Sequence, residues 1–489
     1  MNDQKSKIQI ECYLAVMAIV IITICTKASP IYPFDDYGDV NCFMTVGRSM
    51  LKGMLPYRDL FEQKGPILYF LHMLAAVISD TSFVGVWFLE IVACFFALHF
   101  AYKILALNIK KGIYCWVALF AVIIYSCASF YYGDTVEELC LPFFMYALYL
   151  TEQLFANQRE ITNKEFFVIG ITSGCIFWMK YSILGYYVGW FIIPVYLMIK
   201  NGDYKKLLES IEAIATGVLV VTIPVIAFFT INGALNDLLH VYFYENIITY
   251  SSSPSGNSLW IILRNLLGGA HVFLKYAPVP LFVILAGMVL RGRKDWCSGL
   301  HIAFTFFVCS LGVFCGGQGI LYYPFALMAL VLIGIAEIAI VVESKTCVVS
   351  NKYIAMPLIV IVLAGICTFA LSTNTSLLKI KYEDMPQYKF KEIICEKENP
   401  TLLNYGFIDG EFFTACNIIP NCKYFCQINV PSQEMYDGQQ RIIDEGGVDF
   451  VVTRNEELKS DNYQLVSTAN HFVEGSVKTF YLYELKSMK

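Results

Sequence analysis

The sequence predicts an all-α polytopic membrane protein with about eleven transmembrane helices, followed by a small C-terminal α/β domain. Three observations support this fold class. The chain of 489 residues is 57% hydrophobic and only 15% charged, whereas soluble domains are about a quarter charged. Apolar runs of about 18–25 residues recur along the chain, which is typical of spanning helices and not of barrel strands. After Leu371 the composition becomes polar.

The apolar runs give the expected spans in order. Hydropathy places them at 8–27, 83–107, 113–131, 138–155, 164–180, 182–200, 207–231, 271–290, 298–315, 321–342 and 352–372. The first run is long enough to span and lacks a small-residue cleavage site, so we expect an anchor and no signal peptide. The interior of the spans is nearly free of charge, with Glu90 and Lys103 isolated or near ends.

One apolar run, residues 67–79, is too short for a comfortable crossing. If it does not cross, the later Lys and Arg clusters fall on the same side as Lys5 and Lys7 near the amino terminus. We therefore expect 67–79 to be a short helix in the interface of the plasma membrane. The amino terminus is then cytoplasmic and the carboxy terminus extracytoplasmic.

The change in composition predicts two domains. Residues 1–373 form the transmembrane domain, with interfacial helices in a first outer loop at 28–80. Residues 374–489 form the extracytoplasmic α/β domain, with strands expected at 401–407, 448–453 and 479–485. Its cysteines can be paired or free if that domain lies outside the cell; they are Cys395, Cys416, Cys422 and Cys426. The net charge of −5 gives no sign of a nucleic-acid surface.

The first outer loop concentrates polar residues at the edge of the membrane. Apolar residues from Val40 to Leu51 recur at helical spacing, which predicts an amphipathic helix lying in the interface. Asp39 is suited to the N-cap of this helix, and Gly53 to its C′ position. A cap can still expose its carboxylate to substrate.

The same loop holds carboxylates and cations together. Sugar transfer from a lipid-phosphate donor needs a carboxylate to take the acceptor proton and cations to hold the leaving phosphate. The carboxylates are Asp35, Asp36 and Asp39, and the cations are Arg48, Arg58 and Lys64. Each cation alone is also an ordinary interfacial anchor. The presence of both signs in one loop favours a catalytic site.

The order of motifs resembles the first extracytoplasmic loop of GT-C glycosyltransferases, which include protein mannosyltransferases and lipid A aminoarabinose transferases. The matching residues are Asp39, Arg48, Gly53, Pro56-Tyr57-Arg58-Asp59 and Lys64-Gly65-Pro66. The resemblance implies inverting transfer from a polyprenyl-phosphate sugar to an extracytoplasmic glycan, lipid or protein, with Asp39 as the catalytic base. Many members have Asp-Glu where this chain has Asp39-Val40, so Asp36 stays a second candidate. The resemblance implies no certain cofactor, and a divalent cation remains open.

Residues of later outer segments fit as substrate contacts. The acids Glu137 and Glu138 begin a span, and Lys180 ends one; each also suits a plain membrane boundary. A Gly-rich turn precedes Tyr322 and Tyr323, which the resemblance places in a late outer loop. Residues 237–250 are expected to line the acceptor side or to join the aromatic belt.

Two other functions fit parts of the sequence. Residues 35–39 spell DDxxD, the magnesium-binding pattern of prenyl-diphosphate enzymes, but the chain has no second aspartate-rich motif to face it. A transporter of lipid-linked sugars would place charges along a pathway within its spans. The nearly charge-free spans favour chemistry at the surface.

The predicted orientation is testable by labelling. A cysteine introduced at Asp39 or in the C-terminal domain should react with a membrane-impermeant maleimide added outside intact cells, whereas one introduced at Lys7 should not. Labelling of residue 39 only from the cytoplasmic side contradicts the orientation, and with it the outer site.

Overall fold

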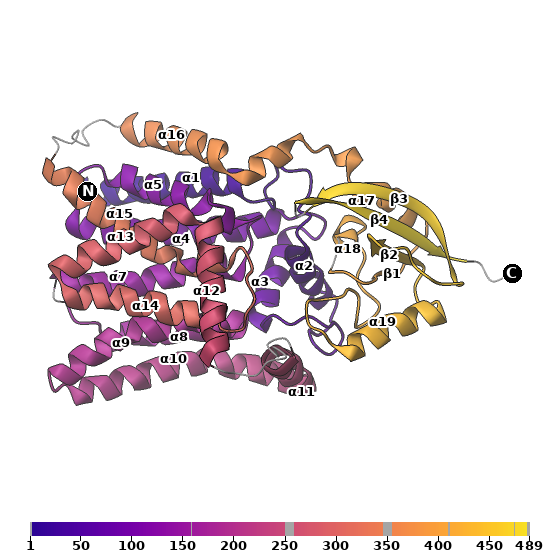
Figure 1. The fold of residues 1–489 in the computed structure, drawn as a ribbon, viewed down its shortest axis with the longest axis horizontal. Helices are drawn as coiled ribbons and strands as arrows, with labels where there is room; N and C mark the ends of the chain where they lie inside the picture. Colours follow the sequence, from indigo (N-terminus) through magenta and orange to yellow (C-terminus); the bar gives the residue numbers. More distant parts are fainter. Residues whose placement is uncertain are drawn as a thin grey trace. The chain divides into compact units, whose positions relative to one another are not determined.

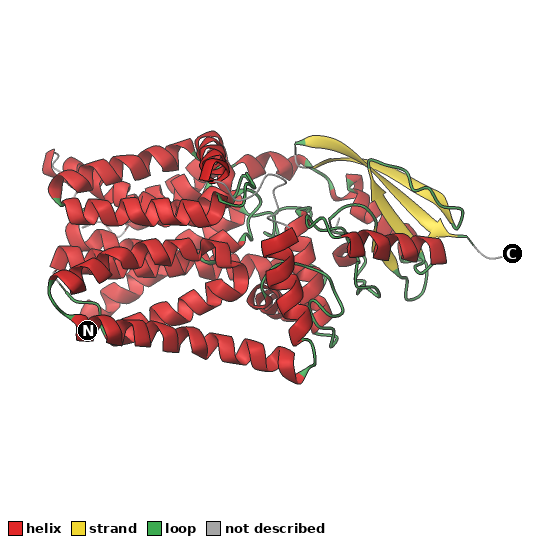
Figure 2. Cartoon of the chain, turned by 60° about the horizontal axis from the view of Figure 1, so that its bottom comes forward, coloured by secondary structure: helices red, strands yellow, loops and turns green. Residues whose placement is uncertain are grey.

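The computed structural model describes residues 2–157, 159–249, 259–345, 355–408, 411–473 and 475–486. Its described residues form two compact units. Unit 1 comprises Met1–Thr26, Leu89–Pro224 and Ser253–Thr375, and unit 2 comprises Lys27–Phe88, Val225–Ser252 and Ser376–Lys489. Helices make up most of the part of the chain that is described, and the strands found there lie towards its C-terminus (Figure 2). The last residue of the expected segment 237–250 and the first three residues of the expected span 352–372 lie outside the described residues.

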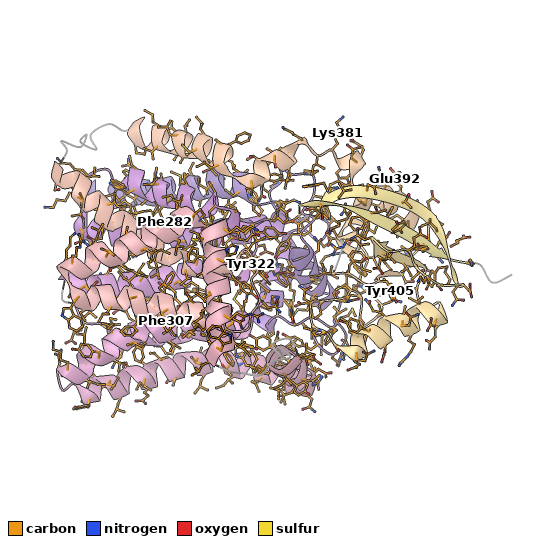
Figure 3. The ribbon with its side chains drawn as sticks, viewed as in Figure 1. Phe282, Phe307, Tyr322, Lys381, Glu392 and Tyr405 are labelled. Carbon is orange, nitrogen blue, oxygen red and sulfur yellow. The ribbon has the colours of Figure 1, made fainter. Side chains whose placement is uncertain are left out.

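Long helices lie side by side in unit 1 (Figure 1). In whole or for the most part it contains α1 (Asn2–Cys25), α4 (Val84–Asn108), α5 (Ile113–Tyr125), α6 (Val136–Leu139), α7 (Leu141–Asn157), α8 (Asn163–Lys180), α9 (Gly185–Lys200), α10 (Tyr204–Ile231), α12 (Leu259–Tyr276), α13 (Pro278–Lys294), α14 (Trp296–Phe314), α15 (Val331–Lys345) and α16 (Ala355–Leu371). Short 3₁₀ turns connect some of them: η1 (Ala128–Phe130), η2 (Tyr181–Leu184) and η4 (Tyr323–Leu330). Phe282 and Phe307, labelled in Figure 3, are 61% and 54% exposed, which suits contact with lipid.

The chain is a multi-pass membrane protein, but the expected count of eleven spans is not confirmed. Among the described residues, seven helices are long and apolar enough to cross a membrane, or up to nine if each of two bent pairs is one span. One expected span, 113–131, is shorter than predicted because α5 ends at Tyr125 after 13 residues. Two others, 164–180 and 182–200, fall within a single helical stretch, Asn163–Lys200.

That stretch reverses direction between α8 and α9. The hydroxyl oxygens of Thr172 and Tyr187 lie 2.8 Å apart, and the rings of Phe166 and Trp190 are 6.5 Å apart. In one straight helix, residues 15 positions apart would be about 22 Å apart. Lys180 is extended, with φ −161° and ψ 91°, and begins the turn. The stretch therefore holds two antiparallel helices.

The expected span 271–290 is wrong at its start. It begins inside α12, which meets α13 at an angle of 112°. The break falls at Ala277, directly before Pro278, whose ring cannot continue the hydrogen bonds of the preceding helix. Figure 1 shows α12 crossing the neighbouring helices of unit 1. Hydropathy averaged over the window did not detect the proline break.

Two expected spans each hold a buried acid that the sequence analysis did not name, Glu152 in 138–155 and Glu337 in 321–342. Arg291 of α13 donates to the carboxylate of Glu152 of α7 at 3.0 Å and to that of Glu337 of α15 at 2.6 Å. Both glutamates are almost fully buried. Lys294 also reaches Glu337, at 2.5 Å. Because two cations face two carboxylates, this network joins three helices without leaving a net buried charge.

Unit 2 combines the first outer loop with the C-terminal region. Its helical elements are α2 (Gly38–Met50), α3 (Pro66–Ile78), α11 (Leu235–Leu238), the π-helix η3 (Leu239–Thr249), α17 (Pro386–Ile394), α18 (Phe412–Ala415) and α19 (Gln433–Glu445). Short 3₁₀ segments, η5 (Thr373–Lys379, which starts in unit 1) and η6 (Tyr382–Asp384), precede α17. The helix α3 lies where the sequence predicted a short helix at 67–79.

The C-terminal region folds around a four-stranded sheet in the order β1-β2-β4-β3. The strands are β1 (Leu402–Asn404), β2 (Phe450–Arg454), β3 (Tyr463–Val473) and β4 (Ser476–Leu485). β1 pairs with β2 in parallel, and the other pairs are antiparallel. Ile443 of α19 packs in a buried cluster with sheet residues such as Leu403 and Val451. The sequence missed β3 because this edge strand is largely polar and lacks a regular apolar alternation.

The helix α2 packs closely on α3 at Gly47. A Cβ atom at this position would lie 2.6 Å from the backbone carbon of His72 and from the backbone nitrogen of Met73. His72 itself is fully buried and contacts the ring of Phe43. Only glycine lets the two helix backbones approach so closely.

We expect Gly47→Ala to destabilise unit 2 by about 1–3 kcal/mol, because the added methyl group meets backbone that cannot move alone. Thermal unfolding of the purified protein in detergent measures the change. Gly268→Ala is the matched control, since no atom lies within 4 Å of a Cβ at that helical glycine. Equal stability of the two variants would contradict the close approach of α2 and α3.

Candidate functional site

The three aspartates in and after the acidic turn before α2 differ in solvent exposure. Asp35 is fully buried, Asp36 is 3% exposed, and Asp39 is partly exposed. Asp35 accepts a hydrogen bond from the backbone N–H of Tyr37 at 3.1 Å, and Asn41 donates to the Asp35 carbonyl at 2.8 Å. These bonds fix the turn that leads into the helix. Asp39 is thus the carboxylate of this turn that a substrate reaches most easily.

Asp36 is buried between two partners from distant parts of unit 2. The Lys27 ammonium forms an ion pair with one carboxylate oxygen, and His471 of β3 contacts the other at 2.7 Å. Lys27 and His471 are 4% and 6% exposed. Burial, and secondarily the charge of Lys27, lower the pKa of His471 to about 4. The imidazole is therefore neutral at pH 7, and its Nε2–H donates to Asp36.

Asp39 lies in the first turn of α2 and does not cap it, which corrects the predicted N-cap. The N-cap residue is Tyr37, whose hydroxyl donates to a carboxylate oxygen of Asp39 at 2.9 Å. A negative charge in the first turn is stabilised by the free N–H groups of the helix end. At the other end of the helix, Gly53 has φ +84°, as expected for a left-handed terminator.

The polar face of α2 is not exposed at an interface, which corrects the predicted environment of this helix. Most of α2, including Asn41, Thr45 and Ser49, is buried inside unit 2. Arg48 is 2% exposed and donates to the carbonyl of Phe413 at 3.0 Å and to the side chain of Asn417 at 2.5 Å. These acceptors belong to the C-terminal region. Arg48 therefore joins α2 to the C-terminal region, and a phosphate bound by it would have to replace these acceptors.

The Pro56-Tyr57-Arg58-Asp59 motif forms a compact turn. Arg58 makes two hydrogen bonds of 2.8 Å to the carboxylate of Asp59, which lowers the pKa of that carboxyl. Its other nitrogen donates to the carbonyl of Asn232 at 3.2 Å. Tyr57 has φ 71° and donates from its hydroxyl to the carbonyl of Lys64. Arg58 itself is exposed, so its guanidinium is accessible to a ligand.

Glu62 is a polar residue of the loop that sequence reasoning missed. It is 4% exposed and accepts hydrogen bonds from the Tyr69 hydroxyl and from the backbone N–H of Lys64. Burial raises the pKa of Glu62; Lys64 opposes this rise and Asp39 adds to it. Asp39 and Lys64 are thus both within electrostatic reach of Glu62. The Lys64 ammonium also lies 5.8 Å from the centre of the Phe43 ring.

The predicted residues of the later segments gather in unit 1. The Lys180 ammonium contacts a carboxylate oxygen of Glu137 at 2.6 Å and lies 4.1 Å from the ring centre of Tyr323. Tyr322, labelled in Figure 3, is 5.4 Å from the same ammonium. Glu138 follows Glu137 in α6, whose N-cap Thr135 accepts from the Glu138 N–H. Four of the five predicted residues therefore form one cluster around Lys180.

A second acidic group of unit 1 was not expected. Glu90 accepts a hydrogen bond from the Thr26 hydroxyl at 2.8 Å and another from the backbone N–H of Asp134 at 2.9 Å. Gly133, with φ +97°, brings the chain so close that a Cβ there would collide with Glu90 and Thr26. Glu90 is thus a buried anchor of the segment before α6.

The described residues contain no group of three or more His, Cys, Asp or Glu side chains arranged to hold a metal ion. The DDxxD aspartates do not converge on one point, because the Asp36 oxygens contact Lys27 and His471. The geometry of this turn therefore does not support the magnesium–diphosphate interpretation.

The buried Asp36–His471 contact predicts a pH dependence of stability. The pKa of His471 is lower in the folded chain than its ordinary 6.5, so the unfolded chain takes up the proton first. The stabilisation is fully present above pH 6.5 and is lost as pH falls towards 4, by roughly 2–3 kcal/mol. Unfolding midpoints at pH 7.0, 5.5 and 4.5 measure this loss.

His471→Gln keeps a donor for Asp36 and should flatten the pH dependence of unfolding. His240→Gln, at an imidazole that is 52% exposed, is the control and should leave it unchanged. An unaltered pH profile in His471→Gln would show that this histidine does not titrate as described.

No protein-family model and no curated protein matches this sequence. Solved structures do match over nearly the whole chain. ArnT from Cupriavidus metallidurans bound to undecaprenyl phosphate aligns with 14% identity and a TM-score of 0.55, covering 96% of this chain and 97% of that one. The apo form aligns with 12% identity and a TM-score of 0.57, covering 98% of each chain. The protein therefore shares the fold of these ArnT structures, which agrees with the resemblance of its first outer loop to that of GT-C glycosyltransferases.

Proposed function

We propose that the protein is an inverting glycosyltransferase that moves a sugar from a polyprenyl-phosphate donor to a hydroxyl group of an extracytoplasmic glycan, lipid or protein. The main support is the position of Asp39, which is partly exposed at the start of α2. Asp39 and the cation Lys64 both act electrostatically on the buried Glu62. The ArnT fold supports a lipid-phosphate donor, since one of those structures holds undecaprenyl phosphate.

In the proposed reaction Asp39 is the general base. The acceptor O–H bond breaks as Asp39 takes the proton, and the oxygen forms a new bond to the anomeric carbon of the donor. The bond from that carbon to the phosphate oxygen breaks on the opposite side, which inverts the configuration and releases polyprenyl phosphate. The hydroxyl of Tyr37 orients the carboxylate of Asp39 for this step.

Lys64 and Arg58 are the proposed phosphate contacts of unit 2. Lys64 is adjacent to the acidic pair, and Arg58 is exposed with a planar group suited to phosphate. Asp36 is assigned to structure, because its carboxylate is already ion-paired with Lys27. Unit 1 holds the further proposed substrate contacts, which come from the sequence: Glu137, Glu138, Lys180, Tyr322 and Tyr323.

We further propose that the protein lies in the plasma membrane with its amino terminus cytoplasmic. Residues 374–489 then form an extracytoplasmic domain, and the first outer loop lies on the same side. Mass spectrometry of the lipid that copurifies with the protein tests the donor class. A polyprenyl phosphate or its glycosyl ester is expected; ordinary phospholipids alone would count against it.

Asp39→Asn should lower turnover by about 10²–10⁴-fold while donor binding changes little, because the amide cannot take the acceptor proton. Transfer from a radiolabelled polyprenyl-phosphate sugar in proteoliposomes measures turnover, and retention of the lipid measures binding. Asp80→Asn, at an exposed carboxylate outside the site, is the matched control.

The same pair of variants separates the proposal from a transporter of lipid-linked sugars. A transporter has no acceptor proton to remove, so Asp39→Asn and Asp80→Asn would then behave alike. Full turnover in Asp39→Asn would exclude Asp39 as the base.

A further inference from the structure

Two cysteines that are far apart in the sequence meet inside unit 2. The Sγ atoms of Cys42, on α2, and Cys426, in the segment before α19, lie 3.6 Å apart. Cys42 is 1% exposed and Cys426 is fully buried. The contact spans 384 positions of the chain. It joins the helix that carries Asp39 to the C-terminal region.

Both cysteines are held by their neighbours. The residues on either side of Cys426 are fixed by backbone bonds: Asn404 donates to the carbonyl of Phe425 at 3.0 Å, and Gln427 donates to the carbonyl of Phe407 at 2.8 Å. On α2, Arg48 binds the C-terminal region two turns after Cys42. The backbones that carry the two sulfurs are therefore held in place on both sides.

We propose that Cys42 and Cys426 form a disulfide that links the helix of the candidate base to the C-terminal region. The sulfurs must approach by about 1.5 Å to reach bonding distance, which small rotations of two short side chains supply. Two S–H bonds break and one S–S bond forms; the two electrons and two protons pass to a disulfide oxidant, which becomes two thiols.

The neighbouring thiols are less suited to this bond. Cys422 is partly buried, and it is close enough to Cys426 for its pKa, raised to about 12 mainly by the loss of solvent, to be affected by it. Cys395 is exposed and donates towards the carbonyl of Cys416 at 3.9 Å. Cys422–Cys426 is thus the main competing disulfide. After proteolytic digestion it gives a different linked peptide from Cys42–Cys426.

The bond is expected to form as unit 2 folds, because burial disfavours the thiolate that attacks an oxidant. In the cell it requires the extracytoplasmic location proposed above, but in purified protein it depends on geometry alone. Once formed, it restrains α2, and with it Asp39, which lies three residues before Cys42. A failed disulfide therefore leaves the proposed glycosyl transfer unaffected, and a failed transfer leaves the disulfide testable.

The experiment uses the full chain in detergent. The protein is incubated with oxidised glutathione just below its unfolding midpoint, its remaining thiols are blocked with N-ethylmaleimide in denaturant, and its peptides are identified by mass spectrometry. We expect most of the Cys42 and Cys426 peptides in one linked species that dithiothreitol separates. Cys422→Ser should keep this species, and Cys42→Ser should abolish it and leave Cys426 alkylated.

The peptide map of the wild-type protein tests the proposal even if the cysteine variants do not fold. Recovery of Cys42 and Cys426 as separately alkylated peptides, or a Cys422–Cys426 linkage in place of theirs, overturns the proposal.

Discussion

The Asp36 carboxylate, buried between the Lys27 ammonium and the His471 imidazole, is the interaction on which unit 2 most depends. A buried carboxylate is tolerated only when partners replace the water it has lost, and removal of one partner typically costs about 3–5 kcal/mol. The three groups come from the end of the first apolar run, from the acidic turn and from β3. The C-terminal sheet and the acidic turn therefore stabilise each other through this contact.

The need of buried polar groups for partners also explains the environment of α2. A helix with arginine, asparagine and serine on one face has to satisfy those groups wherever it lies. Here carbonyl and amide oxygens of the C-terminal region accept from Arg48, and Asn41 donates to the acidic turn that precedes it. Because both ends of α2 are held, Asp39 has a defined position while staying partly exposed. That combination of fixed position and access is what a general base requires.

Unit 1 also pairs buried charged groups, here between its own helices. Arg291, Glu152 and Glu337 are charged groups that hydropathy alone would not bury together, yet Arg291 pairs with both glutamates. Lys180 is neutralised by Glu137 and lies against the faces of two tyrosines. Charged groups buried among apolar helices are costly unless paired, so these clusters restrict how the helices pack.

The sequence by itself determined the membrane class, the approximate positions of most long helices, the short helix at α3 and three of the four strands. These follow from local composition and periodicity, which neighbouring residues express without reference to the rest of the chain. The motif order of the first outer loop likewise implied the fold that the ArnT structures share.

Only the tertiary structure decided which acids are buried and which remain open. Asp36 and Asp39 are equivalent by type and differ because His471, 435 positions away, contacts one of them. The sequence predicts Arg48 as a phosphate contact and does not reveal that Phe413 and Asn417 lie beside it. No sequence pattern indicated Glu62 as a residue of the site, since its environment depends on Tyr69 and on the charges of Lys64 and Asp39. Burial and pairing depend on distant residues, and a pattern read along the chain carries no information about them.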